Sequence, residues 1–107
     1  MSYPNRPEAA AVSHLLAAPS IADRCAPHVD GDAVDWTGIF AEAETMSGGE
    51  QLLVRIASDL ATREGTVALS ELSERLARPT FDRVLEALEL ARGDDVVRYA
   101  EVLRQAA

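Results

Sequence analysis

The clearest pattern of hydrophobic and polar positions lies between Ser47 and Gly65. Ser47 and Glu50 are three residues apart, the spacing at which a serine oxygen and a carboxylate each accept a hydrogen bond from a free amide at a helix start. Gly65 is typical of a left-handed helix stop. Between them, apolar residues recur at helical intervals, at Leu52, Leu53, Ile56 and Leu60. The pattern predicts a helix over 48–64, and we expect it to be buried with the other helices packed on it.

Shorter helical patterns flank this segment on both sides. They predict helices over 7–18, 21–26, 36–45, 70–77, 80–92 and 95–105, several of them bounded by proline or glycine. Residues 28–35 are predicted to be a polar connection, and residues 1–6 a frayed start. The expected inward positions are Val12, Leu15, Leu16, Trp36, Ile39, Phe40, Leu72, Leu76, Phe81, Val84, Leu85, Leu88, Val96, Val97, Ala100 and Leu103. We expect the helices that begin at Trp36, Gly48 and Thr80 to form the core.

The composition agrees with this helical reading. The chain has 107 residues, of which 48% are hydrophobic but only 5% aromatic, so alanine, leucine and valine must fill the interior. Alanine and leucine favour helices over strands. The prediction is therefore an all-α fold in a single domain over 1–107, a compact bundle of five to seven short helices.

The charge is strongly negative and unevenly spread. Ten basic residues stand against eighteen acidic ones, for a net charge of −8. Residues 1–53 carry two arginines and eight acids, a net charge of −6, whereas residues 54–107 carry eight arginines and ten acids, a net charge of −2. An acidic surface repels nucleic acid and attracts a basic protein partner. The candidate partner-binding residues are the acids Asp30, Asp32, Asp35, Glu42 and Glu44.

The residues that could carry metal or catalytic chemistry form no convincing group. Cys25 is the only cysteine, so an internal disulfide is excluded. His14, Cys25 and His28 offer three zinc ligands without an evident fourth, and 30–41 departs from a calcium loop at several ligand positions. We therefore predict no metal, no cofactor and no enzymatic activity. The first residues contain no apolar run typical of a signal peptide or membrane span, so a cytoplasmic location is expected.

Met46-Ser-Gly-Gly-Glu-Gln51 resembles the signature motif of ATP-binding cassette ATPases. The resemblance implies that amides after Ser47 face a nucleotide phosphate, as helix N-termini can. The chain has no lysine and hence no Gly-x-x-x-x-Gly-Lys loop to hold the phosphates. We interpret the segment as a capped helix start, and keep a nucleotide-associated subunit acting through Ser47–Gly49 as a third hypothesis.

Residues 70–92 resemble a helix-turn-helix pair. A winged-helix-like transcription factor using the helix 80–92 is therefore the alternative function. The face that this helix would show to a DNA groove carries Asp82, Arg83, Glu86 and Glu89, which is net negative. This charge disfavours DNA as a partner.

A longer resemblance covers residues 36–93. The segments Trp36–Phe40, Met46–Ala57, Arg83–Leu88 and Ala91–Gly93 together resemble a group of small uncharacterised helical proteins of actinobacteria. The resemblance implies a compact helical domain and transfers no site residue.

The leading hypothesis is a non-catalytic protein-interaction module, an adaptor or regulator that binds a partner through its acidic N-terminal half. No membrane partner is expected. Self-association stays open, because Ala9, Ala10 and Ala17 could form a small-residue face for a second copy.

Overall fold

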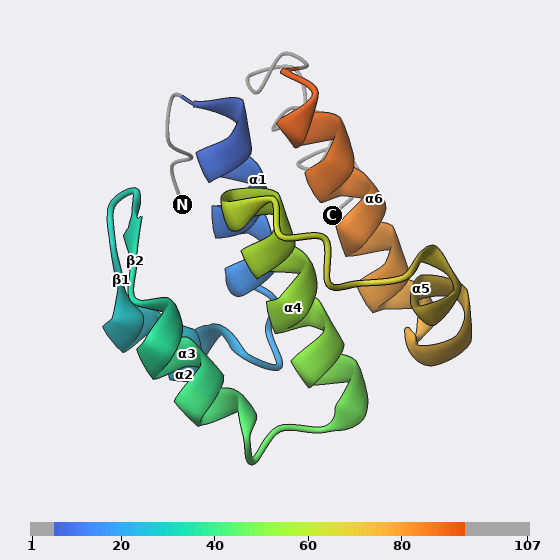
Figure 1. The fold of residues 1–107 in the computed structure, drawn as a ribbon, viewed down its shortest axis with the longest axis horizontal. Coiled ribbons are helices and arrows are strands. Elements are labelled where there is room, and N and C mark those ends of the chain that lie inside the picture. Colours follow the sequence, from blue (N-terminus) through green and yellow to red (C-terminus); the bar gives the residue numbers. More distant parts are fainter. Residues whose placement is uncertain (1–5, 94–107) are drawn as a thin grey trace.

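The computed structural model describes residues 6–93. This part of the chain is all-α, as predicted, apart from one small hairpin (Figure 1). The helices are α1 (Pro7–Leu16), α2 (Ala22–Cys25), the 3-10 turn η1 (Ala26–His28), α3 (Trp36–Ala43), α4 (Gly48–Thr62), α5 (Leu69–Arg75) and α6 (Arg78–Ala91), and the strands are β1 (Val29–Asp30) and β2 (Ala33–Val34). None of these helices is long and apolar enough to cross a membrane.

Helix α4 lies in the middle of the fold, with α3 and the hairpin on one side and α5 and α6 on the other (Figure 1). Its start is the predicted capping box: the Ser47 Oγ accepts from the Glu50 amide at 3.2 Å, and the Glu50 carboxylate accepts from the Ser47 amide at 2.9 Å. Leu52, Leu53 and Ile56 are buried, as predicted. The helix ends at Thr62, two residues before the predicted end, because Arg63 already adopts the left-handed conformation with φ +62°.

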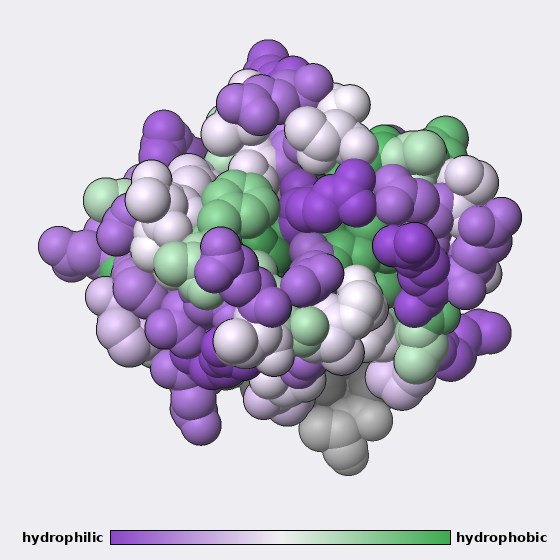
Figure 2. All heavy atoms as spheres, turned by 60° about the horizontal axis from the view of Figure 1, so that its bottom comes forward, coloured by the Kyte–Doolittle hydropathy of each residue, from purple (hydrophilic) through white to green (hydrophobic). Residues whose placement is uncertain are grey.

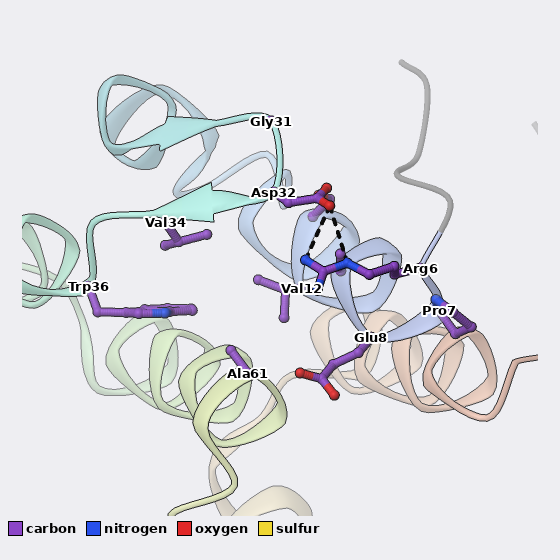
Figure 3. A pocket seen from close by; sticks show the side chains of 11 residues that line it. Arg6, Pro7, Glu8, Val12, Gly31, Asp32, Val34, Trp36 and Ala61 are labelled. Atoms are coloured by element: carbon purple, nitrogen blue, oxygen red, sulfur yellow. Dashed lines mark hydrogen bonds and ion pairs between the residues drawn. The ribbon is translucent and has the colours of Figure 1, made fainter.

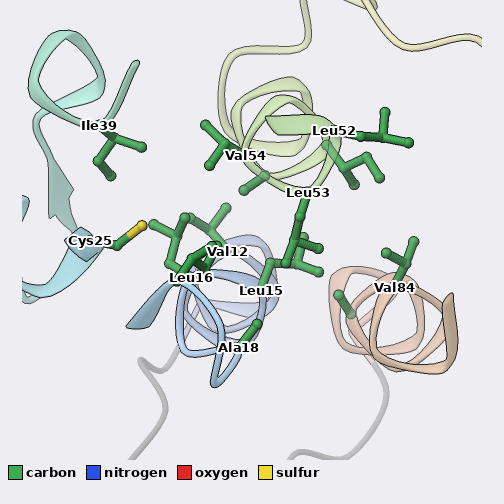
Figure 4. Close-up of a cluster of buried hydrophobic side chains, with 14 of the residues drawn as sticks. Val12, Leu15, Leu16, Ala18, Cys25, Ile39, Leu52, Leu53, Val54 and Val84 are labelled. Atoms are coloured by element: carbon green, nitrogen blue, oxygen red, sulfur yellow. The ribbon is translucent and has the colours of Figure 1, made fainter. Parts of the chain in front are cut away.

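Helix α1 shares the centre of the core with α4, a role that the sequence did not predict. It packs along both α4 and α6, and these are the two most extensive helix pairings of the described residues. Leu15 of α1 meets Leu53 of α4 and faces α6 (Figure 4). Ala10 and Ala11 are fully buried. Small side chains let helices approach closely, which explains why an alanine-rich segment lies inside. Ala10 is therefore not part of an exposed face for a second copy.

The buried stripe of α6 differs from the predicted one. Val84 is buried as expected, but Leu85 and Leu88 are 44% and 40% exposed, while Ala87 and Leu90 are fully buried. The reason is that α6 packs mainly on α1, and the face that it buries carries Val84, Ala87 and Leu90. The helix also begins at Arg78, with Pro79 in its first turn, rather than after the proline at Thr80. Proline fits the first turn of a helix because no hydrogen bond is required of its nitrogen there.

The segment 28–35, which was predicted to be a polar connection without a strand, contains the hairpin. Val29 pairs with Val34 and Asp30 with Ala33 in an antiparallel register. Gly31 has φ +61°, which glycine adopts without strain in a tight turn.

The hairpin leads directly into α3, whose apolar face is narrower than predicted. Asp35 caps this helix as expected, its Oδ1 accepting from the Gly38 amide at 3.1 Å. Ile39 is fully buried and Trp36 half-buried, but Phe40 is 41% exposed.

The remaining boundaries shift by a few residues. The first helix ends at Leu16 rather than Ala18, and the segment predicted over 21–26 forms α2 followed by η1. Helix α5 spans 69–75 rather than 70–77, so Leu76 lies just after it. Leu72 and Leu76 both pack against the core as predicted. Gly93, with φ +87°, follows α6 close to the start of α1: a Cβ at Gly93 would lie 3.7 Å from the Pro7 ring. The helix predicted over 95–105 lies outside the described residues, as do residues 1–5 of the predicted frayed start.

Candidate partner-binding surface

The five candidate acids gather on the hairpin and on α3. Asp30 ends β1, Asp32 lies in the hairpin turn, Asp35 caps α3, Glu42 lies in the last turn of α3, and Glu44 follows it. Asp32, Asp35 and Glu42 have partners: Asp32 pairs with Arg6 at 3.1 Å, Asp35 holds the Gly38 amide, and Glu42 pairs with Arg24 at 3.1 Å. The side chains of Asp30 and Glu44 make no hydrogen bond or ion pair with the residues that the structure describes.

Arg24 gives Glu42 a structural role. Its Nε donates to the Glu42 carboxylate, its Nη2 donates to the Glu42 carbonyl at 2.7 Å, and it also reaches the Thr45 hydroxyl. His28 lies between Asp35 and Glu42, with ring nitrogen to carboxylate distances of 3.8 and 3.9 Å. These contacts tie α2 and η1 to both ends of α3. Glu42 is therefore less available to a partner than Asp30 or Glu44.

A cavity opens beside the acids, between the start of α1, the hairpin and α3 (Figure 3). Its volume is about 460 Å³. The Trp36 ring and Val34 form one side, and Arg6 and Pro7 form the other, with Val12 between them (Figure 3). The sequence alone does not reveal this cavity, because its walls come from segments up to 55 residues apart, from Arg6 to Ala61.

Two carboxylates border the cavity, and each is held by an exposed arginine. Arg6 contacts the Asp32 Oδ2 through Nη2 at 3.1 Å and Nε at 3.3 Å, and the Arg6 side chain is 71% exposed. Arg63 contacts Glu8 at 3.3 Å, and its side chain is 83% exposed. Ion pairs this exposed contribute only about 0–1 kcal/mol, so both carboxylates can exchange their partners.

A separate apolar surface lies where α4, α5 and α6 meet. Leu69 is 85% exposed, and it borders a hollow of about 200 Å³ together with the half-exposed Leu88. Figure 2 shows apolar patches on the right-hand side, where α5 and α6 lie in Figure 1, among mainly hydrophilic residues. The hollow is lined by Ile56, Asp59, Leu60, Val67, Leu69, Leu72, Val84 and Leu88. Leu88 was predicted to lie in the core, so this surface was not predicted.

The N-terminus of α4, where the resemblance to the ATPase signature motif lies, already carries a carboxylate. The Glu50 carboxylate accepts the Ser47 amide, and this hydrogen bond lowers the pKa of Glu50. A phosphate at the same position would have to displace a carboxylate of like charge, which opposes its binding. The geometry thus favours the capping role of Ser47 that we inferred from its spacing.

Two of the four residues on the expected DNA-facing side of α6 turn toward α1 instead. The Arg83 guanidinium donates to the His14 carbonyl at 2.6 Å, and the Glu86 carboxylate lies 3.1 Å from the His14 ring. His14 is only 3% exposed, and its burial lowers its pKa. Arg83 and Glu86 therefore join α6 to α1.

The residues considered for metal or thiol chemistry do not converge. Within residues 6–93, no three His, Cys, Asp or Glu side chains are placed to hold a metal ion. Cys25 is 1% exposed, and burial raises the pKa of its thiol. A raised pKa reduces the thiolate fraction and so the reactivity of the sulfur. Cys25 fills the core beside Ile39 and Val12 (Figure 4).

Comparisons with protein-family models, curated proteins and solved structures found no significant match. The resemblance of residues 36–93 to small actinobacterial proteins therefore stays a prediction. Function must be argued from the chain's own surfaces.

Proposed function

We propose that this chain is a non-catalytic protein-interaction module, an adaptor or regulator in the cytoplasm, that binds a basic partner through its acidic N-terminal half. The observation that supports this most is the cavity beside the hairpin. It combines apolar walls with the carboxylates of Asp32 and Glu8, so a partner gains both buried apolar area and charge pairing at one place.

The charge around the cavity supports the choice of a basic partner. Asp30 and Glu44 lack partners among the described residues, and Asp32 and Glu8 are held only by exposed arginines. An acidic field of this kind raises the association rate of a basic protein and makes that rate depend on salt. Glu42, which Arg24 holds, contributes to this field without needing to contact the partner.

The test is affinity capture from native cells with three versions of the chain. The first is the wild type, and the second carries Asp30→Asn, Asp32→Asn and Asp35→Asn. Asparagine keeps the size of each side chain, and at position 35 it also remains a good helix cap. The third, a matched control, carries three Glu→Gln changes at exposed acids that have no ion-pair partner among residues 6–93: Glu64, Glu74 and Glu89.

Each of the two variants is three charge units less negative than the wild type. A difference in the proteins that they retain therefore reports where the acids lie and not the net charge. We expect a basic protein to be retained by the wild type and the control at low salt and to be lost from the asparagine variant. If the same proteins are retained by all three versions, the acidic half is not the binding surface.

The two other functions have less support from the geometry. DNA reading by α6 would need Arg83, which is engaged with α1. Nucleotide binding would place a phosphate at a helix start where the Glu50 carboxylate, of like charge, already accepts the Ser47 amide. A mobility-shift assay with mixed duplex DNA, and amide exchange after Ser47 with and without ATP, test these alternatives directly.

A further inference from the structure

We infer that the cavity between α1, the hairpin and α3 receives an arginine side chain of the partner. This inference rests on the proposed function and deepens it, because it states which chemical group of a basic partner is recognised and where. Four properties of the cavity support this inference: its size, its apolar walls, the carboxylates at its rim and one aromatic ring.

The size and walls suit the aliphatic part of an arginine. A volume of about 460 Å³ lies in the range of sites that enclose a small ligand or a large side chain. The walls are formed by Pro7, Val12, Val34, Trp36 and Ala61. An arginine buries its methylene stem along apolar surface while its charged end stays at a polar rim.

The rim supplies the counter-charge. Asp32 comes from the hairpin turn and Glu8 from the first turn of α1, so the two carboxylates approach the cavity from different elements (Figure 3). The chain's own Arg6 already places a guanidinium on Asp32, with two nitrogens within 3.3 Å of one oxygen. Arg6 thus shows that this carboxylate accepts a guanidinium at the cavity, and its 71% exposure leaves it replaceable.

The Trp36 ring adds a preference for a flat cation. It extends toward the centre of the cavity below Val34 (Figure 3). Tryptophan is the best aromatic partner for a cation, and a guanidinium can also stack on its face. The lysine ammonium is not flat and cannot donate two parallel hydrogen bonds to one carboxylate as a guanidinium can. Arginine therefore suits a site with an aromatic wall and carboxylates at its rim better than lysine does.

Trp36 is the only tryptophan in the chain, so its emission is a specific probe of the cavity. The ligand is a five-residue peptide with a central arginine between glycines, capped at both ends. The matched control peptide carries citrulline, which has nearly the same shape but no charge. We expect the arginine peptide to change the Trp36 emission and to bind about tenfold more tightly than the citrulline peptide. Equal binding of the two peptides would overturn the inference.

The Arg6→Ala variant tests whether the cavity binds a cation or an anion. If the cavity binds arginine, removing the competing guanidinium raises the affinity for the peptide about two- to fivefold, the range expected for one exposed ion pair. Arg78→Ala is the matched control, because Arg78 also forms an exposed pair, with Asp82 at 3.1 Å, and neither residue lines the cavity. This variant should leave the affinity unchanged. Weaker peptide binding by Arg6→Ala would show that Arg6 itself holds the ligand and would overturn the inference.

Trp36→Leu tests the aromatic wall, with Phe40→Leu as the control on the same helix. Binding is then followed by NMR shifts of the backbone amides, after circular dichroism has shown that each variant is folded. We expect Trp36→Leu to lose most of the affinity and Phe40→Leu to keep it. A different outcome is that the variant with asparagine at 30, 32 and 35 loses its native partner while Arg6→Ala and Trp36→Leu leave peptide binding unchanged. That result would support the acidic half as the binding surface and show that the cavity is not an arginine site.

Discussion

Leu15 and Leu85 provide the sharpest test of how the helices pack. Both are leucines in helices at least ten residues long, and sequence periodicity placed both in the core. In the structure Leu15 is fully buried between α4 and α6, whereas Leu85 is 44% exposed. The same substitution, leucine to alanine, should therefore have very different effects at the two positions.

The magnitudes follow from the buried carbon atoms. Leu15→Ala removes three carbons, which cost about 2.4 kcal/mol at roughly 0.8 kcal/mol per buried methylene. The closed site between three helices leaves a cavity, so a total loss of about 3–4 kcal/mol is expected. Leu85→Ala removes carbons that are only about half buried and opens no closed cavity, so its cost is about 1 kcal/mol. A domain of this length has a free energy of unfolding of about 5–15 kcal/mol, so Leu15→Ala removes a large share of it.

The assay is urea unfolding followed by far-ultraviolet circular dichroism, with Trp36 emission as a second probe. The change in the free energy of unfolding is taken from the midpoint at unchanged slope. A Leu15→Ala chain that is already unfolded in buffer agrees with the reasoning, provided that Leu85→Ala stays folded. Equal destabilisation by the two substitutions would refute both the central place of α1 and the orientation of α6.

Ser47→Ala removes the side-chain cap of α4 and should lower the free energy of unfolding by about 1 kcal/mol, whereas Ser47→Asp, which can still cap, should restore most of it; thermal unfolding measures both. His14 should make the fold sensitive to acid. Because burial lowers its folded pKa below the ordinary 6.5, the unfolded chain takes up the proton first, and stability falls as the pH drops below about 6.5. Unfolding midpoints from pH 8 to pH 5 should decline less for His14→Gln than for the wild type. Gly38→Ala should fail to stabilise α3, although alanine usually does so by about 0.5–1 kcal/mol, since the new Cβ would meet the His28 ring and the Asp35 cap.

Local signals explain what the sequence predicted well. The capping box of Ser47 and Glu50 depends on residues three apart, so the start of α4 was located to the residue. Helix class, the cap at Asp35 and the burial of Leu52 followed from the same short-range chemistry.

The predictions that were wrong or missing concern contacts between segments that are distant in the sequence. The sequence pattern of α6 allows two apolar faces to be buried, one that includes Leu85 and one that includes Ala87. Which of them is buried depends on packing against α1, whose Ala10 and Ala11 are themselves buried. The hairpin has two residues per strand, too few for an alternating pattern, although Gly-Asp, which forms its two-residue turn at 31–32, is a known hairpin signal. The cavity could not be predicted because Arg6, Asp32 and Trp36 are brought together only by the tertiary fold.

The pairing of α1 with α6 also has a consequence for folding during synthesis. Pro7 and Gly93 lie side by side, so nearly the whole described chain forms one loop between them. During synthesis α1 leaves the ribosome before α4 and α6, and the side of α1 that α6 covers has no partner until α6 follows, some sixty residues later. At about 5–20 residues per second, this side of the helix stays exposed for several seconds, during which a chaperone can bind it.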